Sequence, residues 1–386
     1  MSGYDVVVVG GGLVGSALSL SLVRCGLQTA LVETGPPGPL PSDATWDARI
    51  YAISPGNADF LRGLGAWEMM DASRIAPIHA MQVWGDDANA RLDFEAYEAG
   101  VPELGFIVES RLMQDALWRQ LQCSGVDIIT RPGVALELDA KGAALTLDDG
   151  RTLQAQLIVG ADGGGSWVRR QAGIGVATMP YGQLGVVANF ETERPHGNVA
   201  RQWFQPEGIL AWLPLPGNRI SIVWSAFETQ AQGLLALDAA AFCDAVARAG
   251  HEALGTLNLI TPPAAFPLRL QRNDAVTGTR LALVGDAAHL VHPLAGQGVN
   301  LGFRDAATLA GLLRVRGPRE AGDPFLLRAY ARSRKADVLS MQAVTTGLQK
   351  LFNNQDPVLA WLRNTGLAVA DRIAPVKRQL MAHAIL

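Results

Sequence analysis

The feature that most constrains this chain is a glycine-rich turn near the N-terminus, Gly10-Gly11-Gly12-Leu13-Val14-Gly15, which fits the pattern G-x-G-x-x-G. The β-branched run Val6–Val9 precedes the turn without alternation, as expected of a central parallel strand covered on both faces. Helical spacing follows over Leu13–Arg24, and Gln28–Val32 has the pattern of a second strand that ends at Glu33. These elements predict a βαβ unit that binds a dinucleotide.

Each glycine of this turn has a separate expected task. Gly10 permits the tight turn, Gly12 lets backbone N–H groups approach a pyrophosphate, and Gly15 lets helix and strand pack closely. The helix N-terminus adds a favourable positive potential. Glu33 is expected to accept hydrogen bonds from the adenosine ribose hydroxyls, because a carboxylate suits a diol and not a phosphate. The alternative of a purely structural glycine turn is disfavoured, because the preceding strand, the following helix and Glu33 all fit the dinucleotide-binding pattern.

Two later acids at strand ends favour FAD over NAD. One strand runs from Leu157 and ends in Asp162-Gly163, and another runs from Leu283 and ends in Gly285-Asp286. Ligands of parallel sheets collect at such ends, and two acids suit the ribityl chain and pyrophosphate edge of a flavin nucleotide. For either acid taken singly, capping of the following helix is an equal alternative.

Charge and cysteine usage exclude several classes of protein. The 36 acidic and 32 basic residues give a net charge of −4, so nucleic acid is not an expected partner. The three cysteines, Cys25, Cys123 and Cys243, form no CxxC pair and no metal-ligand spacing, so no metal site is expected. The N-terminus lacks the charged start and cleavage site of a signal peptide, which predicts a cytoplasmic location.

The middle of the chain has a different pattern, with short strands between about Tyr181 and Pro267 that predict an inserted sheet domain. These strands are expected at Val186–Phe190, Gln202–Phe204, Ile209–Leu213 and Ile220–Trp224. Leu281–Val284 returns to the buried-strand pattern, and a helical stretch is expected after Gly285 as far as about Arg314.

Taken together, the three blocks around Gly10, Asp162 and Asp286 resemble the FAD-dependent aromatic hydroxylases of the p-hydroxybenzoate hydroxylase fold. Further segments are similar to the ubiquinone-biosynthesis hydroxylases, which act on polyprenylated phenols. These segments are Asp47–Arg49 with Ala52–Ser54, Val108–Ser110, Gln205–Leu215 and His292–Gly302. The resemblance extends over essentially the whole chain. One departure is Gly164-Gly165, where relatives usually have Ala-Asn, so a less stiff loop is expected after Asp162.

The resemblance implies an α/β fold with a Rossmann-like FAD-binding domain, an inserted β-sheet substrate domain and C-terminal helices. We expect the FAD-binding domain in three parts, 1–74, 98–180 and 268–324. The substrate domain is expected to contain strands from 75–97 and the sheet at 181–267, and residues 325–386 are expected to form the C-terminal helical region.

The segment after the third block has its own physical interpretation. Pro293–Gly298 is too rich in turn-forming residues for a helix, whereas Val299–Leu313 has helical spacing. The free N–H groups and the helix N-terminus would then stabilise the negative charge of a reduced flavin, and a large side chain at Gly296 or Gly298 would obstruct its ring. The cofactor-binding residues expected here are Pro293, Gly296, Gly298, Val299 and Asn300.

The reaction implied by the resemblance has NADPH or NADH reduce FAD, O2 form a flavin C4a-hydroperoxide, and the terminal oxygen transfer to an electron-rich ring. The resemblance also assigns Arg49 to the cofactor's phosphate or to the face of its ring. His292 is a candidate catalytic residue that passes a proton or orients the phenol, and a structural, hydrogen-bonded histidine is the alternative.

Two apolar regions are open to two interpretations. The aromatic residues of the middle domain, including Trp203, Trp212 and Trp224, either wall a substrate channel or form a core. The basic, amphipathic stretch from Leu359 to Leu386 either closes the core or rests on a membrane surface. The second interpretation implies a peripheral location on the inner face of the membrane and association with other ubiquinone-biosynthesis proteins.

Two alternative functions remain at this point. A hydroxylase of a small soluble aromatic acid would have an arginine-lined pocket, whereas a prenylated phenol needs an open apolar channel. A non-catalytic FAD-binding subunit of a biosynthetic complex is the other alternative. The absence of CxxC disfavours a disulfide-type flavin reductase, and the absence of W-x-W-x-I-P disfavours a flavin halogenase.

Overall fold

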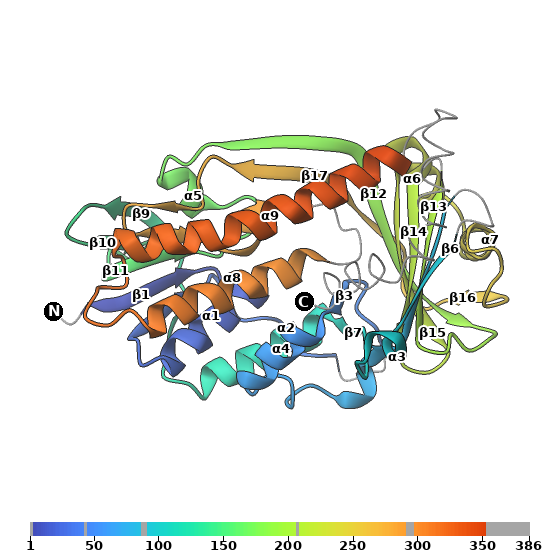
Figure 1. The fold of residues 1–386 in the computed structure, drawn as a ribbon, viewed down its shortest axis with the longest axis horizontal. Helices are drawn as coiled ribbons and strands as arrows, with labels where there is room; N and C mark the ends of the chain where they lie inside the picture. The colour runs from blue at the N-terminus through green and yellow to red at the C-terminus, as the bar shows by residue number, and fades with distance from the viewer. Residues whose placement is uncertain (1–2, 42–44, 86–90, 206–207, 291–296, 353–386) are drawn as a thin grey trace.

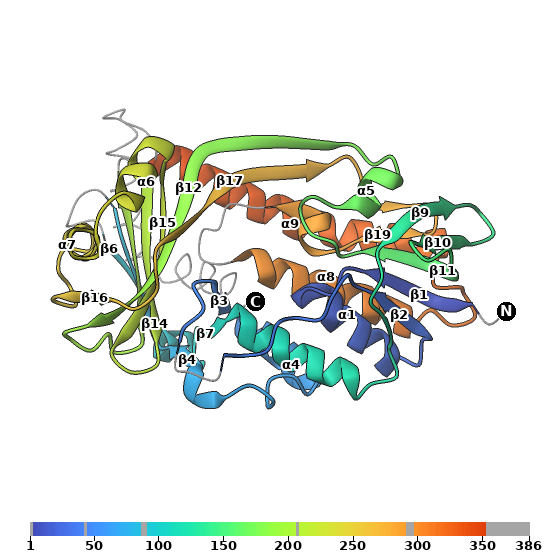
Figure 2. The ribbon, with the colours of Figure 1, turned by 180° about the vertical axis from the view of Figure 1, so that it is seen from behind.

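The protein consists of two β-sheet units that lie side by side and are joined by long strands (Figure 1). The computed structural model describes residues 3–41, 45–85, 91–205, 208–290 and 297–352. One unit has a mainly parallel sheet covered by helices, and the other has a tall antiparallel sheet with two short helices on its outer side (Figures 1 and 2).

The first sheet is built around the strand predicted from Val6–Val9. This strand, β1, pairs in parallel with β2 on one side and β11 on the other, and Val6, Val7 and Val8 are completely buried. The order is β18-β19-β11-β1-β2-β8, with β10 beside β11 and β9 beside β10. Its strands are β1 (Tyr4–Val9), β2 (Thr29–Val32), β8 (Asp127–Ile129), β9 (Gly133–Leu138), β10 (Ala143–Leu147), β11 (Thr152–Gly160), β18 (Thr277–Gly278) and β19 (Leu281–Leu283).

Both faces of this sheet are covered, which explains why β1 lacks polar alternation. Val6 and Val8 pack in the core shared with helices α1, α4 and α8, while Val7 and Val9 pack with β10 and α5 on the opposite face. The helices of this unit are α1 (Leu13–Arg24), α2 (Pro55–Gly63), α4 (Ser110–Gln122), α5 (Trp167–Gln171), α8 (Gln297–Arg314) and α9 (Pro324–Phe352).

A small three-stranded sheet joins the two units in the order β3-β7-β4. Its strands are β3 (Ile50–Ile53), β4 (Ala76–Ile78) and β7 (Gly105–Glu109), and the short helices η1 (Ala72–Arg74) and α3 (Ala96–Ala99) lie in the same stretch of chain.

The second sheet contains the strands predicted for the middle of the chain, each longer than expected. The order is β20-β17-β12-β15-β14-β13-β5-β6, with β16 beside β12, so strands from the 75–97 segment belong to this sheet. The elements of this unit are β5 (Ala80–Trp84), β6 (Arg91–Glu95), β12 (Val176–Thr192), β13 (Val199–Gln205), β14 (Gly208–Leu215), β15 (Arg219–Phe227), α6 (Glu228–Leu235), α7 (Ala239–Ala249), β16 (Leu257–Leu259), β17 (Ala264–Asn273) and β20 (His289–Leu290).

Strands β12 and β17 extend beyond the limits expected at 181 and 267. They remain paired from Val176 opposite Asn273 to Val187 opposite Ala264, with one irregularity between Pro180 and Leu184. In both ribbon views this pair runs from the tall sheet along one side of the molecule to α5 in the first unit. The two units are therefore connected by continuous hydrogen-bonded strands.

The helical stretch expected after Gly285 begins later than predicted and ends at Arg314, as expected. The chain first forms a 3₁₀ turn, η2 (Gly285–Ala287), and then the short strand β20, which pairs with β17. Helix α8 begins at Gln297. Residues 291–296 and 353–386 lie outside the described residues, and the expectations for the C-terminal stretch from Leu359 to Leu386 fall there.

Within the described ranges, the helices are too short or too polar to cross a bilayer.

A buried charge network joins α9 to α8. Asp305 on α8 accepts hydrogen bonds from Arg334 Nε on α9 (2.6 Å) and from the Gly285 backbone N–H (2.9 Å), and it bonds His289 Nε2 (2.7 Å). Burial alone would raise the pKa of Asp305, but the charges and hydrogen bonds of His289 and Arg334 outweigh it and lower that pKa. The network therefore stabilises the ionised carboxylate.

Replacing Arg334 with Met should lower the free energy of unfolding by about 3–5 kcal/mol, because it removes one partner of a buried ion pair. Because the folded-state pKa of Asp305 is depressed, the stability it contributes is present above its unfolded pKa and is lost as pH falls. The difference between the variant and the parent should therefore shrink below about pH 4. Denaturant unfolding at several pH values measures both effects. Arg332→Met, an exposed position on the same helix, is the control; equal losses in both variants would contradict the prediction.

Candidate active site

A cavity of about 1360 Å³ lies between the two units. It begins at the glycine-rich turn after β1, passes the ends of β11 and β19, and reaches the inner face of the second sheet. Pockets for one drug-sized ligand usually measure about 300–1,000 Å³, so this cavity has room for a large cofactor together with a second molecule.

The glycine turn has the geometry predicted from its pattern. Gly10 has a φ of +106°, and a Cβ there would lie 2.5 Å from the Ala161 carbonyl oxygen. A Cβ on Gly15 would overlap the Gly10 carbonyl oxygen, so α1 packs on the turn only without a side chain at that position. A Cβ on Gly12 would meet nothing within 4 Å. This open approach to the N-terminus of α1 fits a pyrophosphate.

Glu33 lies beside this turn, at the end of β2 and in the wall of the cavity. Its Oε2 accepts a hydrogen bond from the Gly11 N–H (2.5 Å), and its Oε1 accepts from the N–H (2.6 Å) and hydroxyl (2.9 Å) of Thr34. Each carboxylate oxygen has two lone pairs, so Oε2 keeps capacity for a ligand hydroxyl. The position matches the one expected for a ribose-binding acid.

Asp162 combines the two roles that the sequence left open, capping of the following helix and contact with a ligand. Its Oδ2 accepts a hydrogen bond from the Val168 N–H in α5 (3.0 Å), which is a capping contact. Its Oδ1 is buried in the cavity wall and has no hydrogen-bond partner within the described residues. A buried acceptor without a partner costs about 1–3 kcal/mol, so Oδ1 fits a ligand that donates a hydrogen bond. Gly163, with a φ of +78°, turns the chain next to it.

Arg169 is a residue of this region that no sequence pattern predicted. Its side chain is buried, and it donates hydrogen bonds to the carbonyl oxygens of Ala287 (3.0 Å) and Gly164 (2.9 Å). It thereby joins the loop after Asp162 to the turn that carries Asp286. A Cβ on Gly164 would lie 2.7 Å from Leu290 Cδ1, so the end of the Leu290 side chain would have to shift to make room for one. Arg169 restrains the loop through its hydrogen bond to the Gly164 carbonyl oxygen.

Asp286 lines the cavity at the end of β19. Its side chain is open to the cavity but enclosed by protein beyond it, and the described residues form no hydrogen bond with its carboxylate. Burial raises its pKa, while the charges of His289, Arg49 and Arg269 oppose the rise. Asp286 is therefore a second acid that lacks a protein partner at the cavity wall.

The segment predicted to face a flavin ring is described only in part. Gly298 and Val299 lie in the cavity wall at the start of α8, and a Cβ on Gly298 would meet nothing within 4 Å. The candidate residues His292, Pro293 and Gly296 lie outside the described residues. The N-terminus of α8 thus borders the cavity, and the helix begins at Gln297, two residues before the helical stretch expected from Val299.

Asn300 has a different role from the one expected, because its side chain connects α8 to the segment between β3 and α2. Its Nδ2 donates to the Ala52 carbonyl (2.7 Å), and its Oδ1 accepts from the Ser54 N–H (3.0 Å) and Asn57 Nδ2 (2.9 Å). The residue is 1% exposed and is absent from the cavity wall. Its side chain fixes the position of α8.

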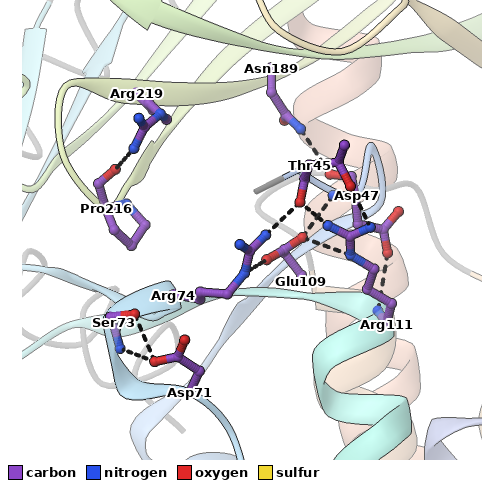
Figure 3. Close-up of polar contacts among 10 residues, drawn as sticks. All are labelled: Thr45, Asp47, Asp71, Ser73, Arg74, Glu109, Arg111, Asn189, Pro216 and Arg219. Atoms are coloured by element: carbon purple, nitrogen blue, oxygen red, sulfur yellow. Dashed lines mark hydrogen bonds and ion pairs between the residues drawn. The ribbon is translucent and has the colours of Figure 1, made fainter. Parts of the chain in front are cut away.

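Arg49 borders the cavity at the end of a segment, Thr45–Arg49, that we call the Arg49 strap. The buried Glu109 holds this strap, as Figure 3 shows: it accepts hydrogen bonds from the Asp47 N–H (2.7 Å), Arg74 Nε (2.7 Å) and Arg111 Nε (3.1 Å). Glu109 belongs to Val108–Ser110, one of the segments that resemble the ubiquinone-biosynthesis hydroxylases. Its role depends on contacts that the sequence does not reveal.

Asn189 on β12 ties the second sheet to the same strap. Its Nδ2 donates a hydrogen bond to the Asp47 carbonyl oxygen (2.8 Å), as Figure 3 also shows. The strap therefore contacts both units at the point where the cavity passes from one to the other.

The tryptophans of the second sheet form a core and do not wall the cavity, whereas Phe266 on β17 does line it. Trp203, Trp212 and Trp224 are buried on the outer face with α6 and α7. Because side chains alternate along a strand, the inner face carries the residues between them. These are mostly small or aliphatic, and those lining the cavity include Val187, Ala200, Gln202, Ile209, Ala211, Leu213, Ser221, Val223 and Ser225.

Known proteins are similar to this chain over nearly its whole length. A family model described as an FAD binding domain matches residues 3–345. Ubiquinone hydroxylase UbiL of Rhodospirillum rubrum is 38% identical, with 99% of this chain and 89% of that protein covered. The 3-demethoxyubiquinol 3-hydroxylase of Escherichia coli is 37% identical, with 99% and 98% covered. Human mitochondrial ubiquinone biosynthesis monooxygenase COQ6 is 33% identical, with 99% and 92% covered.

Solved structures show the same fold. PqsL of Pseudomonas aeruginosa, in complex with 2-aminobenzoylacetate, superposes with a TM-score of 0.78 at 22% identity, with 95% of this chain and 99% of that one covered. The p-nitrophenol 4-monooxygenase PnpA of Pseudomonas putida gives a TM-score of 0.77 at 18% identity, with 99% and 97% covered.

Two glycine variants should separate cofactor binding from folding. Gly12 occupies the N-cap of α1 with extended backbone, so Gly12→Asp should fold with unchanged or higher stability of the cofactor-free protein. Its negative charge should repel the pyrophosphate and weaken flavin binding by about 100-fold or more. Gly15→Ala should weaken flavin binding and should also lower the stability of the cofactor-free protein, because its Cβ would overlap the Gly10 carbonyl oxygen. Flavin titration and thermal unfolding of the cofactor-free proteins measure this; tight flavin binding by Gly12→Asp would contradict it.

Asp286→Asn should raise the stability of the cofactor-free protein at pH 7. A carboxyl group with a raised folded-state pKa stabilises the fold below its unfolded pKa, and this contribution is lost as pH rises through the folded-state value. The amide removes the cost of the enclosed charge, so the gain should disappear as pH falls towards 4. Thermal unfolding at both pH values tests this. Asp244→Asn, an exposed position on α7, controls for the loss of one charge. A less stable Asp286→Asn protein at pH 7 would refute the assignment.

Proposed function

This chain belongs to the family of FAD-dependent ubiquinone-biosynthesis hydroxylases, and we propose that it is an NAD(P)H-dependent monooxygenase that hydroxylates the ring of a polyprenylated phenol or benzoquinol. The observation that carries the proposal is the continuity of the cavity, from the dinucleotide-type turn at Gly10 to the apolar wall of the second sheet. A cofactor at one end and an aromatic substrate at the other would then meet inside the protein.

The residues of the first unit fit FAD, which supplies the redox chemistry and the activation of oxygen when it is bound. Gly12 and the N-terminus of α1 would hold the pyrophosphate, and Glu33 would accept hydrogen bonds from the ribose. Asp162 would offer its Oδ1, which has no partner among the described residues, and Asp286 its carboxylate at the cavity wall, to donor groups of the cofactor. The N-terminus of α8 at Gly298 and Val299 would favour negative charge on the ring.

The wall of the second sheet supports an apolar substrate over a small aromatic acid. Arg201 also borders the cavity, but its Nη1 donates to the carbonyl oxygens of His196 (3.2 Å) and Val199 (3.3 Å). Arg49 and Arg269 border the cavity near Asp286 and so face the cofactor end. The remaining wall is dominated by small and aliphatic side chains, which suit a prenyl chain.

In this proposal, the second sheet with its strands from 75–97 and 181–267 is the substrate domain. The Arg49 strap closes the boundary between that domain and the cofactor domain, and the enclosure keeps water from the reacting atoms. A polyprenylated substrate dissolves in lipid and not in water, so we place the enzyme at a membrane surface, with direct transfer from other enzymes of the pathway as the alternative supply.

The flavin-loaded protein should oxidise NADH or NADPH slowly by itself and faster when a prenylated phenol is added, with one oxygen atom of ¹⁸O2 recovered in the product ring. Oxidation should respond far less to a soluble hydroxybenzoate. Oxygen consumption and mass spectrometry of the product measure both. A protein that stays colourless in the presence of added FAD would contradict the proposal, and flavin binding without any turnover would instead favour a non-catalytic subunit.

A further inference from the structure

Tyr51 on β3 lines the cavity, and the proposed function gives it no role so far. Its side chain packs against the core of the first unit, but protein covers it only in part. A tyrosine has an apolar ring and one polar tip, so a ring held against the core places the hydroxyl at the open side. The hydroxyl of Tyr51 is therefore available to a molecule in the cavity.

Two hydrogen bonds fix the part of β3 that carries Tyr51. Before it in the chain, the Arg49 carbonyl oxygen accepts a hydrogen bond from the N–H of Ser110, the first residue of α4 (2.9 Å). After it, the Ala52 carbonyl oxygen accepts from Asn300 Nδ2 in the first turn of α8 (2.7 Å). Tyr51 is therefore tied to the starts of two helices, α4 and α8, and both starts border the cavity.

Helix α4 shows how far this point lies from the glycine turn. Gln114, one turn after Ser110, donates a hydrogen bond from Nε2 to the Gly11 carbonyl oxygen (2.7 Å). Residues four apart share a face of a helix, and a rise of 1.5 Å per residue separates these two by about 6 Å along the axis. Both line the cavity. A dinucleotide with its pyrophosphate at the glycine turn, extending towards α8, would thus pass Tyr51 with its flavin-bearing half.

The surroundings of Tyr51 keep its hydroxyl protonated. Burial raises the pKa of Tyr51, the charge of Asp286 raises it further, and the charge of Arg49 and a hydrogen bond with the Ser110 side chain oppose the rise. A hydrogen bond that lowers this pKa is one in which Tyr51 accepts, so its own O–H proton is left for another acceptor. The residue therefore presents a hydrogen-bond donor to the cavity beside the acceptor Asp286.

We propose that Tyr51 is a cofactor-binding residue whose hydroxyl donates a hydrogen bond to an oxygen in the FMN half of FAD. The ribityl chain and the phosphate of that half carry several oxygen atoms, which suit a phenol donor. Asp286 would accept hydrogen bonds from the same half, so the two residues have complementary tasks. The inference rests on the proposed function for the identity of the cofactor and adds a recognition residue to it.

The test compares the cofactor-free parent with Tyr51→Phe, which keeps the ring and removes only the hydroxyl. The thermal stability of the cofactor-free variant should be close to that of the parent, because the ring still packs on the core. The Kd of FAD, followed by the change in flavin fluorescence, should rise about tenfold, and the stabilisation by added FAD should shrink accordingly. Tyr97→Phe, at a position on α3 that is 92% exposed, should change neither quantity.

Two fragments of the cofactor locate the contact. The Kd of FMN should rise in Tyr51→Phe by a factor similar to that for FAD, whereas the Kd of AMP, measured by competition with FAD, should not change. Equal FAD affinity in the parent and Tyr51→Phe, or equal losses for FMN and AMP, would overturn the inference. A parent that binds FAD but oxidises no NAD(P)H in the presence of a prenylated phenol would overturn the proposed function instead, and the Kd values would still decide on Tyr51.

Discussion

The close packing of Gly15 against the Gly10 carbonyl oxygen determines where α1 begins and which way its N-terminus faces. Because α1 follows β1 at the centre of a parallel sheet, this N-terminus lies at the edge where β11 and β19 also end. Glu33, Asp162 and Asp286 reach the same cavity because their strands end at that edge. The candidate site is thus a consequence of one backbone contact and of the parallel arrangement around it.

Four acids of the described residues, Glu109, Asp305, Asp162 and Asp286, divide into two groups by their hydrogen-bond partners. Glu109 and Asp305 are each surrounded by arginine, histidine or backbone donors, and they hold the Arg49 strap and the helix pair α8–α9 in place. Among the described residues, Asp162 keeps one carboxylate oxygen without a partner at the cavity wall, and the Asp286 carboxylate is open to the cavity and accepts no hydrogen bond. Fully paired acids build the scaffold, whereas acids with unused oxygens mark the space for a ligand.

The sequence predicted those elements of the fold that short, local patterns of residues determine. The strand–turn–helix around Gly10, the strands ending at Asp162 and Asp286, and the middle-domain strands all follow from short patterns of residues. It did not reveal Arg169, Glu109 or Asp305 as central residues, because their hydrogen bonds join positions far apart in the chain. Alternation along the middle strands indicated two faces, but the choice of which face met the cavity depended on where α6 and α7 pack.

The continuous pairing of β12 with β17 has a mechanical consequence. Residues 176–180 of β12 lie in the first unit and use β17 as their partner, and β17 also carries β20 next to the Asp286 turn. Cutting the chain where β12 or β17 passes from one unit to the other would leave unpaired strand edges in both pieces. The substrate-side unit is therefore not a cassette that can be exchanged between relatives or expressed by itself; a graft that alters substrate choice must keep both spanning strands and replace only the residues that point inward.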